Sequence, residues 1–190
     1  SSFDAAVTKM NTVTDTGYGT TLTKIIVSLF ANLEEPPTGS TSRSKAAQVA
    51  ASIVKEIGQK VTEIGVAKVP KEEVQNLTDT TTSQTLKNTP DDKKAEAMEG
   101  LATSVVKGAE ARTDGAATEV VKSANAGLIS ANAKAASKTY TADKAIAAAK
   151  EALTKQSAAL KASTNTDLQA NSDTITSEGT TKADESKTVA

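Results

Sequence analysis

The chain has 190 residues, a formal net charge of −1, no cysteine and no histidine. The absence of these two residue types excludes disulfides, thiol nucleophiles, imidazole acid–base chemistry and the usual zinc sites. Aromatic residues make up only 2% of the chain, and alanine is abundant. We therefore expect slender helices that pack closely through small side chains, and not a thick globule. No segment has the ~18 continuous apolar residues of a membrane helix, so we predict no transmembrane segment.

The strongest hydrophobic pattern lies near the N-terminus. Six apolar residues follow the i, i+3, i+4, i+7 spacing of one helix face: Leu22, Ile25, Ile26, Leu29, Phe30 and Leu33. Pro36 and Pro37 end this segment, because proline cannot continue the helical hydrogen bonding. We predict that these six residues form a core helix or an assembly face.

A second amphipathic helix is predicted to start near Ser42 or Ser44 and to end at Gly65. Its apolar face includes Ile53, Ile57 and Ile64, which complete the predicted core or assembly face. We expect this helix to pack against residues 22–33.

The next stretch is shorter and more polar. Pro70 is expected to open a helix of about two turns, and the threonine-rich residues 78–83 are predicted to form a loop. This loop suggests a sub-boundary near residues 78–89. Asn76 begins an Asn-Leu-Thr sequon and is a predicted glycosylation site, which slightly favours a secreted setting.

The alanine-rich part from about residue 90 carries clear start and stop signals. Thr89 and Pro90 followed by two aspartates predict a helix start. A break or a new cap is expected at residues 113–115, where either one long helix or two helices in series fits the pattern, and Thr141 is expected to cap a further helix. The inward face between these signals is predicted to be apolar and small: Met98, Leu101, Ala102, Val105, Ala109, Ala117, Val120, Val121, Ala124, Leu128, Ala131 and Ala135.

From residue 163 onward serine, threonine, asparagine and aspartate dominate. We therefore predict a helical domain over residues 1–162 and a polar, disordered tail over residues 163–190. The predicted fold class is all-α: a bundle of about five to seven helices with a long alanine-rich C-terminal part and a flexible tail.

The residues offer little chemistry. A serine nucleophile would need a lysine base, but the sequence-adjacent serine–lysine pairs point in different directions on a helix. The adjacent acids, such as Asp91 and Asp92, are explained by their places in first helical turns, and no calcium loop or phosphate-binding loop is present. Lysines alternate with acids, and there is no basic block. We predict no enzyme activity, no cofactor or metal, and no nucleic-acid binding.

The remaining signal is the set of amphipathic helices. In composition, alanine-rich segments such as residues 134–137 and 145–149 resemble helical extracellular structural proteins of silks and helical surface coat proteins of parasites and spirochaetes. This resemblance implies a secreted or cell-surface subunit of a fibre, coat or matrix that self-associates. Two alternatives stay open: a secreted or surface-exposed bundle that binds a protein partner, and a carrier of small apolar ligands.

Overall fold

The computed structural model describes residues 43–188, with side chains from residue 52 to 187. This part of the chain is all-α, as predicted, and contains no strand. It has seven α-helices and three 3-10 turns: α3 (Arg43–Lys68), η1 (Lys71–Glu73), α4 (Val74–Lys87), η2 (Asp91–Lys93), α5 (Lys94–Glu110), α6 (Ala117–Lys134), α7 (Ala142–Lys161), α8 (Thr166–Ala170), α9 (Ser172–Glu185) and η3 (Ser186–Thr188).

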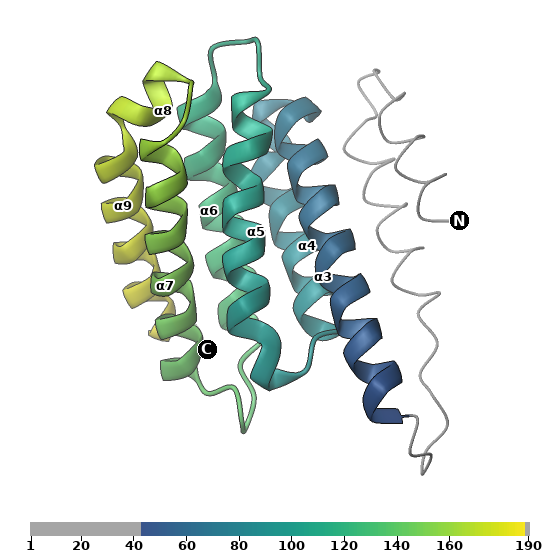
Figure 1. Cartoon of the computed structure of the whole chain (residues 1–190). Helices are drawn as coiled ribbons and strands as arrows, with labels where there is room; N and C mark the ends of the chain where they lie inside the picture. Colours follow the sequence, from purple (N-terminus) through teal and green to yellow (C-terminus); the bar gives the residue numbers. More distant parts are fainter. Residues whose placement is uncertain (1–42, 189–190) are drawn as a thin grey trace.

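The long helices form three antiparallel hairpins, which stack side by side (Figure 1). The hairpins are α3–α4, α5–α6 and α7–α9, and the short α8 lies in the turn of the third. Helices α3, α5 and α7 make one layer, and α4, α6 and α9 make the other. Among the described helices, each hairpin therefore contacts mainly its neighbours, and the first and third hairpins form the two edges of the stack.

The turns use the residues whose backbone preferences suit them. Pro70 and Pro90 are extended, with φ of −49° and −57°, and each precedes a 3-10 turn that leads into α4 or α5. Gly115 has a φ of 75° between α5 and α6, in the left-handed region that favours glycine. Thr141 accepts a hydrogen bond from the backbone N–H of Lys144 at the start of α7, which confirms its predicted capping.

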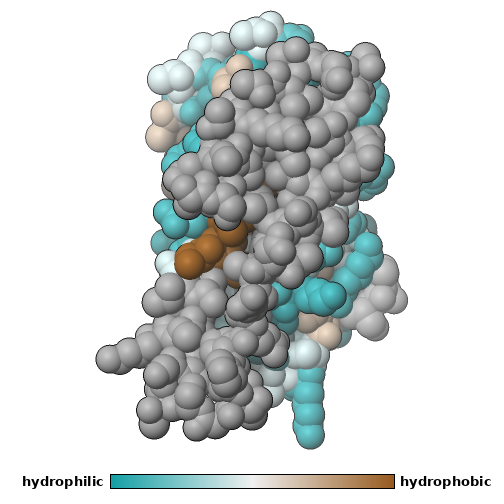
Figure 2. Space-filling view, turned by 90° about the vertical axis from the view of Figure 1, so that its right-hand side faces the viewer, coloured by the Kyte–Doolittle hydropathy of each residue, from teal (hydrophilic) through white to brown (hydrophobic). Residues whose placement is uncertain are grey.

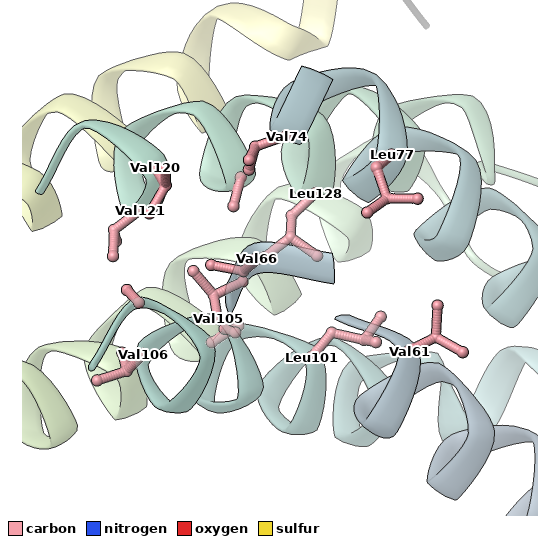
Figure 3. Packing of buried hydrophobic residues seen from close by; sticks show 14 of the residues in the cluster. Val61, Val66, Val74, Leu77, Leu101, Val105, Val106, Val120, Val121 and Leu128 are labelled. Carbon is pink, nitrogen blue, oxygen red and sulfur yellow. The ribbon is translucent and has the colours of Figure 1, made fainter. Parts of the chain in front are cut away.

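The core lies between the two layers. Figure 3 shows Val66 of α3, Val105 of α5 and Leu128 of α6 pointing into one shared space, with Val74 of α4 beside them. The apolar inward residues predicted for α5 and α6 are buried, except Ala135, which is half-buried directly after the end of α6. The hydrophobic cluster runs continuously from α3 into α9, because it includes Ile175.

Glycines mark the places where helices approach most closely. A Cβ atom at Gly127 of α6 would lie 2.5 Å from the Gln75 carbonyl oxygen and 2.8 Å from the Asp79 nitrogen, both in the backbone of α4. A Cβ atom at Gly108 of α5 would lie 2.5 Å from the Glu63 carbonyl oxygen of α3. Each layer therefore contains a contact that no other residue type fits without movement of the backbone.

Two predictions about the first hairpin are wrong. Helix α3 continues beyond Gly65 to Lys68, and the threonine-rich stretch predicted as a loop with a sub-boundary is the middle of α4. Thr78, Thr81 and Thr85 are buried, and each hydroxyl donates to the carbonyl oxygen four residues earlier. Because the helix backbone satisfies these hydroxyls, threonine can line a buried helix face.

The predicted disordered tail does not hold for residues 166–188. These residues form α8, α9 and η3, and α9 packs against α7 and α6. Sparse apolar residues are enough here, because Leu168, Ile175 and Ala183 each have at most 1% exposure. The predicted helix over residues 22–33 lies outside the described residues.

Replacing Gly127 with alanine tests the close approach of α6 to α4. The added methyl group meets backbone atoms that cannot rotate away, so we expect the free energy of unfolding to fall by about 1–3 kcal/mol in urea denaturation.

The matched control is Gly100→Ala in α5, where the added Cβ would meet only the flexible side chain of Gln59. This variant is expected to be neutral, or to gain up to about 1 kcal/mol from its better helix propensity. Equal losses in the two variants would contradict the close packing of α4 and α6.

Candidate functional site

A buried polar contact joins α5, α6 and α7. Asn125 of α6 and Gln156 of α7 are 2% and 0% exposed, and their amide groups donate to each other at 2.8 Å in both directions. The Gln156 amide also donates to the carbonyl oxygen of Ala102 in α5. Every one of these contacts is internal, so the pair positions helices and presents no group to a ligand.

A second polar contact holds the turn between α6 and α7. The Tyr140 hydroxyl donates to Asn132 at 2.6 Å, and the Asn132 amide donates to the carbonyl oxygen of Ala145. Lys94 of α5 lies 5.3 Å from the centre of the Tyr140 ring, in cation–π geometry. Burial, together with the nearby Asp91 carboxylate, raises the pKa of the Tyr140 phenol well above its ordinary value.

Asp91 contacts an ammonium group and two hydroxyls in this region. Its carboxylate is paired with Lys94 at 2.7 Å and accepts hydrogen bonds from the hydroxyls of Ser137 and Thr139. The Lys94 ammonium, followed by the two hydroxyls, holds the pKa of Asp91 well below its usual range. Asp91 therefore ties the start of α5 to the α6–α7 turn as a permanent carboxylate, and it is not poised to exchange protons near neutral pH.

Arg112 makes a third polar contact, at the opposite end of α5. Its guanidinium donates to the carbonyl oxygens of Val66 and Val69 at 2.9 and 2.8 Å, and it pairs with Asp114 at 2.6 Å. The hydrogen bond from Arg112 lowers the pKa of Asp114 to about 2. Arg112 thus satisfies carbonyl groups at the C-terminal end of α3, which would otherwise lack partners.

A groove of about 590 Å³ lies between the N-terminal ends of α5 and α7. Alanines line part of it, and its charged lining residues beyond Asp91 are Asp92, Lys144 and Glu151. Lys144 donates to the carbonyl oxygen of Thr139 at 3.3 Å. The groove has two exposed acids and no paired nucleophile and base, so its residues suit a polar contact with a partner better than a reaction.

The described residues contain no group of three or more acids that could hold a metal ion. The hydroxyls of Ser83, Ser104 and Ser137 are engaged by Asp79, a helix carbonyl and Asp91. These serines are therefore not placed against a lysine base. No helix within residues 43–188 is long and apolar enough to cross a membrane.

The predicted core or assembly face divides into three parts. Ile57 and Ile64 of α3 are buried, at 3% and 5% exposure, whereas Ile53 is 42% exposed. Ile53 is the exposed large hydrophobic residue of the described chain, and Figure 2 shows an exposed hydrophobic area on the side of the molecule where α3 lies. The remaining members lie outside the described residues: Leu22, Ile25, Ile26, Leu29, Phe30 and Leu33.

The predicted glycosylation site lies in a helix. Asn76 is exposed on α4, but Leu77 and Thr78 of the same triplet are buried, and the Thr78 hydroxyl donates to the carbonyl oxygen of Val74. Acceptor sequons usually occupy surface loops, so the folded chain does not present this triplet in its usual setting.

Sequence reasoning missed Asn125, Gln156 and Tyr140 as the residues that fix the interior. Asn125 lies between two alanines, and both Asn125 and Gln156 occupy positions that the helical period places inward. That signal could have identified them as a buried pair. The link from Asp91 to the α6–α7 turn spans more than forty residues and has no local signature.

We compared the chain with protein-family models, with curated proteins and with solved structures, and none of them matches it. Any functional conclusion therefore rests on the residues and their geometry.

Replacing Gln156 with methionine tests the buried amide pair. The substitution keeps the length of the side chain but leaves the Asn125 amide without its partner in an apolar interior, so we expect a loss of about 2–3 kcal/mol in the free energy of unfolding. Adding Asn125→Leu to this variant removes the unpaired amide. The double variant should therefore lose less than the sum of the single losses, and simple additivity in urea denaturation would contradict the pairing.

The raised pKa of the Tyr140 phenol predicts that the folded chain loses stability at high pH. Its pKa is raised in the folded state, so its contribution is fully present below the unfolded pKa of about 10 and is lost as the pH rises through the folded value. We expect the free energy of unfolding to fall above about pH 10. Tyr140→Phe should weaken that dependence in denaturation measured across pH. Tyr18 is present in both proteins, so its titration cancels, and identical slopes would refute the assignment to Tyr140.

Proposed function

We propose that this protein is a non-catalytic structural subunit that assembles with copies of itself in an extracellular fibre, coat or matrix. The observation that carries the proposal is the exposed Ile53 on α3, at the edge of the stack of hairpins. A single large apolar side chain in that place is suited to contact another molecule, because burying it removes apolar surface from water.

The magnitude of this contact favours many weak interactions over one tight one. Full burial of an isoleucine side chain contributes about 1.5–3 kcal/mol, which is too little for a stable dimer by itself. An assembly held by such contacts would depend strongly on concentration and would grow by repetition, as a fibre or a matrix does.

The interior supports a non-catalytic role. Asn125, Gln156 and Asp91 would be the natural candidates for chemistry among the described residues, but each is occupied by contacts between helices. A residue whose hydrogen-bonding capacity is used in this way stabilises the arrangement of the hairpins. It is not free to act on a substrate.

The second candidate function is binding to a protein partner through the groove between α5 and α7. Asp92 and Glu151 give that groove unpaired acidic groups above an alanine-lined surface, which suits a basic segment of a partner. If the chain stays monomeric at every concentration, binding to a protein partner replaces self-assembly as the proposed function. The groove does not suit a carrier of small apolar ligands, because charged residues contribute to its lining.

Replacing Ile53 with lysine tests the assembly. We expect self-association, measured by sedimentation velocity over a wide concentration range, to weaken by about tenfold or more. The matched control is Ala158→Lys on the exposed surface of α7, which should associate like the unmodified chain. A purely monomeric unmodified chain over the whole range would contradict the proposal.

A further inference from the structure

Three isoleucines form one column along α3. Ile53, Ile57 and Ile64 are separated by four and seven residues, so they share a face of the helix at ~100° per residue. We call the surface that they define the α3 flank.

The contacts of α3 with the second hairpin come from a different face. Lys55 pairs with Glu96 of α5 at 2.8 Å, Gln59 meets Gly100, and Val66 meets Gly108. These α3 residues lie roughly 160° around the helix from the α3 flank. The α3 flank therefore faces away from α5, toward the side of the stack where none of the described helices follows.

Helix α4 covers this side only in part. It lies against α3 near Gly58, where Thr85 would be 2.4 Å from an added Cβ atom. Gly58 is ~100° around α3 from Ile57, its neighbour in sequence. Even so, Ile57 and Ile64 are buried, at 3% and 5% exposure, and only Ile53 is open. Ile57 and Ile64 thus behave as core, as members of the hydrophobic cluster, although they lie toward the side of α3 that α4 covers only in part.

We propose that the apolar stripe of residues 22–33 binds the α3 flank within the same chain and leaves Ile53 as the open part of it. The lengths match: both Ile53 to Ile64 and Leu22 to Leu33 span eleven residues, or about 17 Å for a helix. The intervening residues 34–42 can reach up to about 30 Å when extended. They therefore allow this stripe to lie along any part of the column.

Attachment to the same chain also favours this occupant over a second copy. A segment joined by a short linker has an effective concentration in the millimolar range, so a free copy competes with it only at similar concentrations. This step rests on the proposed function: the stripe limits self-association by covering most of the assembly surface. Releasing it exposes Ile57 and Ile64 together with Ile53.

The chain has no native cysteine, so introduced thiols report proximity cleanly. Lys60 is exposed beside the column, and in the full-length chain Lys60→Cys is combined with Asn32→Cys or, for the opposite direction, with Thr23→Cys. A short bismaleimide should link one of these pairs within a single chain, which gives a faster-migrating monomer in denaturing electrophoresis. The control pair, Asn32→Cys with Lys182→Cys on α9 at the other edge, should not be linked.

A second pair of variants tests the competition. Leu29→Asp in the crosslinking background should abolish the link and increase self-association in sedimentation, whereas Ala31→Asp, on the opposite side of the predicted helix, should change neither. No link in either direction, or links only between two chains, would overturn the proposal. If the link within one chain forms but no variant self-associates, the intramolecular contact stands and the proposed assembly function fails.

Discussion

The structure depends on how closely its helices can approach, and that distance is set by glycine, alanine and threonine. Gly108 lets α5 meet the backbone of α3, and Gly127 lets α6 meet the backbone of α4. A chain with so few aromatic residues cannot fill a wide interior. It remains stable only if the gap between helices is narrow enough for alanine to fill. The two-layer stack of hairpins satisfies this constraint, because each helix lies between close neighbours.

Close packing through small side chains leaves the register of the helices weakly specified. Successive alanines present side chains of the same size and shape, so a helix could slide by one turn with little loss of apolar contact. The buried amides remove this freedom, because Gln156 can reach both Asn125 and the carbonyl oxygen of Ala102 in only one alignment of α5, α6 and α7. Tyr140 and Asp91 fix the adjoining turn in the same way. The polar contacts thus specify the arrangement, and the apolar contacts supply most of the stability.

The sequence predicted what is local and missed what is long-range. The apolar stripe of α5 and the Thr141 cap depend on residues a few positions apart, and these predictions were correct. For residues 113–115 the sequence allowed either one long helix or two, and the structure has two separate helices, α5 and α6. The helix over the threonine-rich residues was missed, because threonine is read as a loop former when its hydroxyl has no partner, and the partner here is the backbone of the helix itself. The order in residues 166–188 was missed because α6 and α7 supply most of the apolar surface against which α9 packs.

The predicted core or assembly face also shows that sequence periodicity does not reveal which residues are exposed, and here that exposure matters for function. Periodicity placed Ile53, Ile57 and Ile64 on one side of a helix, and it could not say which of them meets water. The structure separates them: Ile57 and Ile64 are buried in the hydrophobic cluster, and Ile53 is exposed. An edge helix in a stack has fewer neighbours than a central helix, so an apolar side chain on its outer side, such as Ile53, is left exposed by the hairpins. A chain that supplies a partner for that side from its own sequence can stay soluble while it keeps a site for assembly. The identity of that partner therefore decides whether the stack ends at its first hairpin or continues into another molecule.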